Sequence, residues 1–183
     1  MKKMYLLLIN SETIFTKFLR IFTKDEYNHV VFTFDDDCEN MYTYARWVTW
    51  MPILAGFEVE NIGKGILKKK PLTECKIYEV DITDDQYEIL GNRLKPFLTK
   101  SKVRHWYNFP ALAYIKLKIP YYNTRNFVCS TFVAFMIGDM IDLNKIFTHV
   151  VPNDYLDLKL PLVYEGKLAK YIDSVVGRKV VGI

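Results

Sequence analysis

The sequence of 183 residues predicts a single α+β domain, spanning residues 1–183, in which an antiparallel sheet packs against helices. Three observations support this fold class. Half of the residues are hydrophobic, which is enough to build one core. Short runs of β-branched and aromatic residues alternate with turn-forming residues, as in antiparallel strands. Other segments carry apolar residues at helical spacing, and the chain has no internal repeat.

Most of the predicted strands lie in the first half of the chain. The first strand is short and apolar on both faces, which indicates a buried position. A helix capped by Ser11 is expected after it, with apolar residues on one face from Ile14 to Phe22. The turn-forming sequence Asp35–Asn40 joins the next two strands into a β-hairpin. The predicted strands of this half are Tyr5–Ile9, His29–Phe34, Met41–Arg46 and Gly56–Glu60.

The second half is predicted to contain more helix. A strand at Cys75–Ile82 precedes a helix that begins at Thr83. The strongly apolar segment Phe127–Ile141 predicts another helix, with Asn126 as its cap. A short helical piece is expected near Gly166–Ile172. The buried face of the helix after Thr83 is expected to contain Tyr87, Leu90, Leu94 and Phe97.

Composition excludes several functional classes. The net charge of +4 is too small and too scattered for a nucleic-acid-binding protein. The cysteines form no CxxC pair and no Cys/His cluster with zinc spacing, so neither disulfides nor a metal or other cofactor is expected. No apolar run is long enough to span a membrane, and Met4–Ile9 is too short for a signal peptide. Free thiols suit a reducing compartment, so a cytoplasmic location is expected.

Cys129 is the strongest candidate for chemistry. It lies in the sequence NFVCSTFVA, at the expected first turn of an apolar helix. A helix N-terminus carries unpaired N–H groups and partial positive charge, which favour a thiolate and lower a cysteine pKa from its ordinary value of about 8.5. The same N–H groups can stabilise an oxyanion. Packing as a small buried hydrophobic residue is the simpler alternative for Cys129.

A nucleophilic cysteine requires a base, and the sequence offers His29, His105 and His149. We favour His29 because it opens the strand HVVFTF, where regular structure fixes its position at a sheet edge. His105 lies among basic and aromatic residues, and His149 follows the cysteine helix. For each histidine, a surface or packing role is the alternative.

Two motifs on the expected elements, YNHVVF and VCSTFVA, are similar to motifs of the circularly permuted NlpC/P60 proteins, a family of papain-like cysteine hydrolases. In that family the histidine strand precedes the cysteine helix, as it does here. The resemblance extends from Tyr5 to about Ile141. It implies a permuted NlpC/P60 fold, with a sheet or partial barrel packed against helices, and a catalytic pair formed by Cys129 and His29.

The sequence departs from the family at the residue that orients the histidine. The family places a polar residue on the following strand, but here a turn centred on Asp37–Cys38 would put Arg46 opposite His29. Arginine cannot accept a hydrogen bond. The remaining candidates are Thr43, Tyr44, Glu58, Glu60 and a backbone carbonyl.

The resemblance implies a cysteine-dependent hydrolase that cleaves amide or ester bonds through a covalent thioester. Its substrate would be a peptide, an amide or an acyl lipid, and the sequence does not choose between peptidase, amidase, thioesterase and acyltransferase. Because the orienting residue is uncertain, an inactive module that binds a peptide or lipid in the same groove is the alternative. A purely structural protein is the third possibility.

Overall fold

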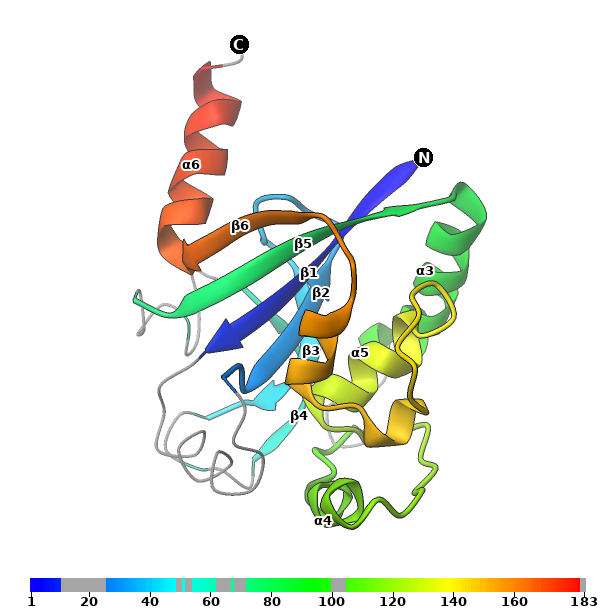
Figure 1. Cartoon of the computed structure of the whole chain (residues 1–183). Coiled ribbons are helices and arrows are strands. Elements are labelled where there is room, and N and C mark those ends of the chain that lie inside the picture. Colours follow the sequence, from blue (N-terminus) through cyan, green and yellow to red (C-terminus); the bar gives the residue numbers. More distant parts are fainter. Residues whose placement is uncertain are drawn as a thin grey trace.

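A six-stranded antiparallel sheet forms the centre of the protein in a computed structural model (Figure 1). The structure describes residues 1–10, 26–48, 51, 54–61, 67, 72–99 and 105–181. Neighbouring strands follow the order β4-β3-β2-β1-β5-β6. The strands are β1 (Lys2–Asn10), β2 (His29–Thr33), β3 (Met41–Arg46), β4 (Ala55–Glu60), β5 (Glu74–Ile82) and β6 (Leu162–Lys167). The α+β class and the antiparallel sheet packed against helices are therefore confirmed.

The two central strands are apolar on both faces, because each face of the sheet is covered. In β1 every residue from Met4 to Ile9 is buried. Successive side chains of a strand point to opposite faces, so β1 contributes to two apolar clusters. Met4, Leu6 and Leu8 join the helix-side cluster, whereas Tyr5, Leu7 and Ile9 join the second cluster with Leu168 and Tyr171.

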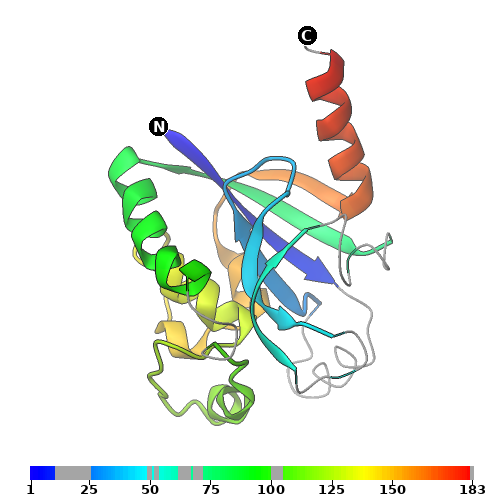
Figure 2. The same ribbon diagram turned by 180° about the vertical axis from the view of Figure 1, so that it is seen from behind.

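Helices lie on the side of the sheet that carries the larger cluster, except the last, which extends from the end of β6 (Figures 1 and 2). The helix α5 packs against β2 and β3, and α3 packs against α5. The helices are α3 (Asp84–Thr99), α4 (Phe109–Leu117), α5 (Cys129–Ile137) and α6 (Leu168–Val181), with 3-10 turns η2 (Phe147–His149) and η3 (Pro152–Asp157). None of the described helices is long and apolar enough to cross a membrane.

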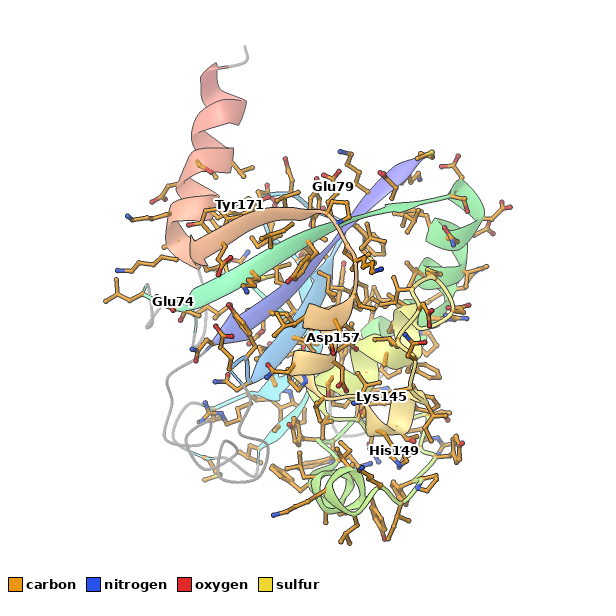
Figure 3. All side chains as sticks on the ribbon, viewed as in Figure 1. Glu74, Glu79, Lys145, His149, Asp157 and Tyr171 are labelled. Carbon is orange, nitrogen blue, oxygen red and sulfur yellow. The ribbon has the colours of Figure 1, made fainter. Side chains whose placement is uncertain are left out.

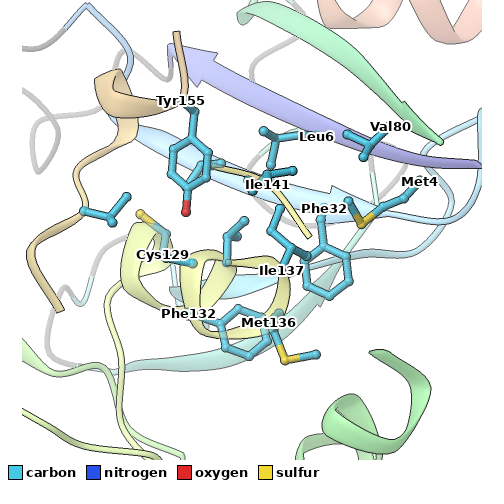
Figure 4. Packing of buried hydrophobic residues seen from close by; sticks show 14 of the residues in the cluster. Met4, Leu6, Phe32, Val80, Cys129, Phe132, Met136, Ile137, Ile141 and Tyr155 are labelled. Atoms are coloured by element: carbon cyan, nitrogen blue, oxygen red, sulfur yellow. The ribbon is translucent and has the colours of Figure 1, made fainter. Parts of the chain in front are cut away.

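The helix-side core is built around α5 (Figure 4). Phe132 is fully buried, and its ring lies 5.1–6.1 Å from five other aromatic rings. These rings come from β2, β3, β4, α3 and the segment before α5, so one side chain joins most of the elements that surround the site. Its partners are Phe32, Tyr44, Phe57, Phe97 and Phe127.

The start of α3 agrees with the prediction. Thr83 Oγ1 accepts a hydrogen bond from the Gln86 N–H at 3.1 Å, and Gln86 Oε1 accepts one from the Thr83 N–H at 2.9 Å. This reciprocal pair is a capping box that begins the helix at Asp84. Leu90, Leu94 and Phe97 are buried as expected, and Tyr87 is partly buried against the same cluster.

Three local predictions are corrected. The helix α5 spans Cys129–Ile137 rather than Phe127–Ile141, and Asn126 does not cap it, because Asn126 Oδ1 accepts the Trp106 N–H at 3.1 Å. The segment predicted as helix near Gly166–Ile172 is divided between β6 and α6, because β6 finds a partner in β5. The predicted helix after Ser11 lies outside the described residues.

The register of the β2–β3 hairpin is also corrected. A turn centred on Asp37–Cys38 would pair Phe32 with Thr43, but Phe32 pairs with Tyr42. The turn adopts a left-handed backbone at Cys38, with φ 55° and a hydrogen bond from the Cys38 N–H to the Asp35 carbonyl at 3.1 Å. Because a shift of one residue exchanges the faces of a strand, this register does not place Arg46 opposite His29.

Candidate active site

Three residues from distant parts of the sequence meet at one site, and each is the terminal residue of its element. Cys129 is the first residue of α5, His29 is the first residue of β2, and Glu60 is the last residue of β4. The strands β2 and β4 lie on either side of β3 in the sheet. Regular structure therefore fixes the backbone of each residue, which a catalytic arrangement requires.

His29 is held by a carboxylate. Its Nε2 atom lies 2.8 Å from Oε2 of Glu60, and the two side chains are only 14% and 13% exposed. Cys129 lies close enough to the same imidazole for its hydrogen bonding and its negative charge to raise the pKa of His29. The imidazole thus has both a carboxylate and a thiol as neighbours.

The surroundings of His29 favour its charged form. Burial alone lowers the pKa of His29, but the negative charge of Glu60 and the hydrogen bonds to Cys129 and Glu60 outweigh burial. Together they raise the pKa of His29 from 6.5 to about 10. His29 is therefore an imidazolium at neutral pH, a form that can stabilise a neighbouring thiolate as an ion pair.

The first turn of α5 is firmly anchored. Ser130 donates a hydrogen bond from Oγ to the Val150 carbonyl at 2.6 Å, and Tyr155 donates its hydroxyl to the Ser130 carbonyl at 2.7 Å. The Val128 N–H donates to Thr131 Oγ1 at 3.2 Å. These contacts fix the helix terminus that carries Cys129, where the first N–H groups have no carbonyl one turn earlier.

Two tyrosines lie within electrostatic reach of the Cys129 sulfur. Burial raises the pKa of Tyr107 and the pKa of Tyr155, and the negative charge of Cys129 raises both further. Figure 4 shows the Tyr155 ring above the start of α5 with its oxygen directed toward Cys129. Both phenols therefore remain protonated at neutral pH, and the Tyr155 hydroxyl donates its proton to the Ser130 carbonyl. Sequence reasoning missed these two residues, because nothing in the local sequence distinguishes them from packing tyrosines.

The position of Tyr107 depends on a close approach between two backbone segments. The Phe57 N–H donates to the His105 carbonyl at 3.0 Å, and the Tyr107 N–H donates to the Ala55 carbonyl at 2.8 Å. Between them, Gly56 lies so near this segment that a Cβ atom would be 2.1 Å from the His105 carbonyl oxygen. Only glycine allows β4 to hold Tyr107 beside the site.

Of the side chains predicted to orient the histidine, the structure brings Glu60 to His29. Thr43 donates its hydroxyl to the Val30 carbonyl at 2.9 Å, and Tyr44 donates to the Arg125 carbonyl at 2.6 Å. Glu58 lies on β4 opposite Thr43. Arg46 is close enough to Glu60 and Tyr107 that their charges act on it: burial lowers the pKa of Arg46, and these two neighbours raise it.

The other two histidines occupy different environments. His105 is buried, and its Nδ1 hydrogen-bonds to the Arg125 carbonyl at 3.1 Å. His149 lies in η2, next to α4 (Figure 3). Among the described residues, no group of three or more His, Cys, Asp or Glu side chains could hold a metal ion.

Comparisons of the chain with models of protein families, with curated proteins and with solved structures found no match.

Proposed function

We propose that the protein is a cysteine-dependent hydrolase of amide or ester bonds, with a papain-like fold of the circularly permuted NlpC/P60 type. The carrying observation is that His29 has two neighbours suited to catalysis: the Glu60 carboxylate at 2.8 Å, and Cys129, which acts on the pKa of His29. Nucleophile, base and orienting carboxylate are the three groups that acyl transfer by a cysteine requires.

In the acylation step, the Cys129 sulfur attacks the carbonyl carbon of the substrate as a thiolate. A C–S bond forms, and the carbonyl electron pair moves to its oxygen. N–H groups at the start of α5 stabilise this oxyanion, and the protonated hydroxyl of Tyr107 is a further donor. The oxyanion collapses, the bond to the amine or alcohol breaks, and His29 gives its proton to that leaving group.

In the deacylation step, neutral His29 takes a proton from water, and the resulting hydroxide attacks the thioester carbon. The C–S bond breaks, the acid is released, and the thiolate forms again beside the imidazolium. The Glu60 carboxylate stabilises the charge that His29 carries before and after the reaction. If an alcohol or amine replaces water, the same steps give acyl transfer.

The substrate class follows from this chemistry as a peptide, another amide or an acyl lipid. A cytoplasmic location remains the prediction from the sequence. The alternative of an inactive binding module arose because the return strand offered no clear partner for His29. The contact between Glu60 and His29 supplies that partner, so it favours the hydrolase.

Alkylation of the three cysteines by iodoacetamide, followed site by site with mass spectrometry, tests the proposal. Cys129 should react faster than Cys38 and Cys75 well below pH 8, because His29 maintains its thiolate. The pKa of Cys75 is raised to about 12 by burial and by the charge of Glu74, so this thiol is an internal control for an unreactive cysteine. In His29→Ala, the advantage of Cys129 at low pH should disappear.

Equal rates at Cys129 and Cys38, unchanged in His29→Ala, would contradict the proposal. If Cys129 does react faster, a panel of electrophilic probes with acyl, peptidyl and lipid-ester groups would identify the substrate class. Labelling should require Cys129 and should be lost in Cys129→Ser.

A further inference from the structure

The segment that follows Tyr107 in the chain, which begins with α4, exposes apolar side chains. The helix α4 is apolar, yet Ala111 is the one residue of it that is buried. The Asn108 side chain caps the helix by accepting the Ala111 N–H at 3.2 Å, so α4 begins directly after Tyr107. Its most exposed positions, Pro110, Ala113, Lys116 and Leu117, recur at helical spacing on one face.

The chain beyond α4 extends this exposed surface. Leu117 is 66% exposed, Ile119 46% and Tyr122 67%, and Tyr121 and Ile146 are exposed as well. We call these five residues the apolar tip. Figures 1 and 2 both place α4 and the chain that follows it at one end of the molecule, away from α6.

Aromatic contacts hold the apolar tip together. The Tyr121 ring stacks on Tyr114 of α4 at 4.8 Å with an interplanar angle of 7°, and the Tyr122 ring lies 5.9 Å from Phe147 in η2. Phe147 directly follows Ile146. Two of the five tip residues, Tyr121 and Tyr122, therefore pack against neighbouring rings.

The stretch of chain that carries four of the five tip residues is basic. No aspartate or glutamate occurs between Glu88 and Asp139, whereas lysine and arginine recur throughout that stretch. Lys116 and Lys118 flank Leu117 of the tip in the chain, and both are exposed. Lys118 adopts a left-handed backbone, with φ 54°, at a position that glycine normally occupies after a helix.

We propose that the apolar tip docks onto the surface of an anionic lipid bilayer. Aliphatic and tyrosine side chains can enter the boundary between headgroups and acyl chains, while the lysines contact anionic headgroups. The nine-residue α4 is far too short to span a bilayer, so it would lie in the plane of the interface. A nucleic acid fits less well, because its phosphates offer nothing to Leu117 and Ile119.

Docking would bring the candidate active site close to the membrane, because Tyr107 and α4 are adjacent in the chain. The inference does not depend on catalysis: Cys129→Ala should bind vesicles as the wild type does. Failure of the hydrolase proposal and failure of membrane docking are therefore distinguishable.

Sedimentation of the full chain with vesicles tests the inference. We expect binding to vesicles that contain phosphatidylglycerol, weaker binding to phosphatidylcholine alone, and release at high salt. The variant Leu117→Ser/Ile119→Ser/Tyr122→Ser should bind at least about tenfold more weakly, and Lys116→Glu/Lys118→Glu should lose the preference for anionic vesicles.

A matched control removes exposed apolar side chains elsewhere. Leu72, Leu162 and Val176 are 68%, 48% and 48% exposed, and the variant Leu72→Ser/Leu162→Ser/Val176→Ser should bind like the wild type. Docking is refuted if the wild type does not bind anionic vesicles, or if the control loses as much binding as the tip variant. A wild-type dimer that the tip variant converts to a monomer, seen by sedimentation velocity, would instead assign the tip to a second copy of the chain.

Discussion

Glu60 Oε2 lies 2.8 Å from His29 Nε2, although the two residues are 31 positions apart and their strands are not neighbours in the sheet. Glu60 therefore reaches His29 through the tertiary arrangement and not through strand pairing. The register pairs Glu60 with Met41 and His29 with Ile9. Pairing with Met41 therefore fixes the backbone of Glu60, and pairing with Ile9 fixes the backbone of His29.

Replacing the carboxylate by an amide should reduce catalysis strongly. In Glu60→Gln the side chain keeps its shape but loses the charge that orients and stabilises the imidazolium, so kcat should fall by roughly 10²–10⁴-fold. Glu58→Gln, two residues earlier on β4, is the matched control and should change kcat little. Steady-state kinetics on the best substrate from the probe panel measures both. Equal losses in the two variants would remove Glu60 from its assigned role.

The protonation of His29 predicts a pH dependence of stability. Its folded-state pKa is about 10 against an ordinary value of 6.5, so the native state holds the proton more tightly than the unfolded chain. The resulting stabilisation is complete below pH 6.5 and is lost as the pH rises toward 10. Over this interval the free energy of unfolding of the wild type should fall relative to Glu60→Gln by on the order of 2 kcal/mol.

Urea unfolding of both proteins at several pH values measures this difference, and NMR of the imidazole nitrogens reports the charge of His29 directly. A neutral His29 in the wild type at pH 7.5 would contradict the assignment. In Glu60→Gln the pKa of His29 should move downward, because burial then opposes protonation with less compensation.

Tyr107 should contribute through its hydroxyl. In Tyr107→Phe the ring remains, but the donor near the Cys129 sulfur is lost, so kcat should fall by about 10–10³-fold while KM changes little. Tyr114→Phe is the control, because Tyr114 lies on α4 and its ring stacks on Tyr121. A change in KM alone would indicate that Tyr107 binds substrate without stabilising the oxyanion.

Gly56 and Gly91 should respond in opposite directions to alanine. At Gly56 the new Cβ would meet the His105 carbonyl oxygen at 2.1 Å, and neither backbone can move without breaking the bridge between Gly56 and Trp106. We expect Gly56→Ala to lower the free energy of unfolding by about 2–4 kcal/mol and to reduce activity, because Tyr107 shifts.

At Gly91, within α3, a Cβ would meet nothing within 4 Å. Gly91→Ala should therefore stabilise the protein by about 0.5–1 kcal/mol, because alanine is the better helix former. Thermal or urea unfolding measures both variants. Similar effects at the two positions would show that the contact at Gly56 is not restrictive.

Local patterns predicted much of the fold. The strand at Met41–Arg46 matches its predicted bounds, and the capping box at Thr83 begins α3 where the sequence indicated. These features depend on residues close in sequence, so neighbouring side chains decide them. The start of α5 was not predictable from nearby residues. The Asn126 side chain accepts a hydrogen bond from the Trp106 N–H, 20 residues earlier, and so does not cap the helix.

The candidate site was predictable in part. The sequence singled out His29 and Cys129, because each opens an element that its own composition defines. It left the orienting residue open among Thr43, Tyr44, Glu58, Glu60 and a backbone carbonyl, since that choice depends on the tertiary arrangement that brings β4 to His29. The unexpected left-handed backbone at Cys38 changed the hairpin register by one residue.

The left-handed backbone of Lys118 predicts which residue selection would favour at this position. Its left-handed backbone costs about 1 kcal/mol relative to glycine. A library selected only for heat resistance should therefore enrich glycine at this position. A library selected for the protein's natural task should keep lysine if its charge is needed. Comparing the residues enriched in the two libraries would show whether lysine at position 118 lowers stability in exchange for function.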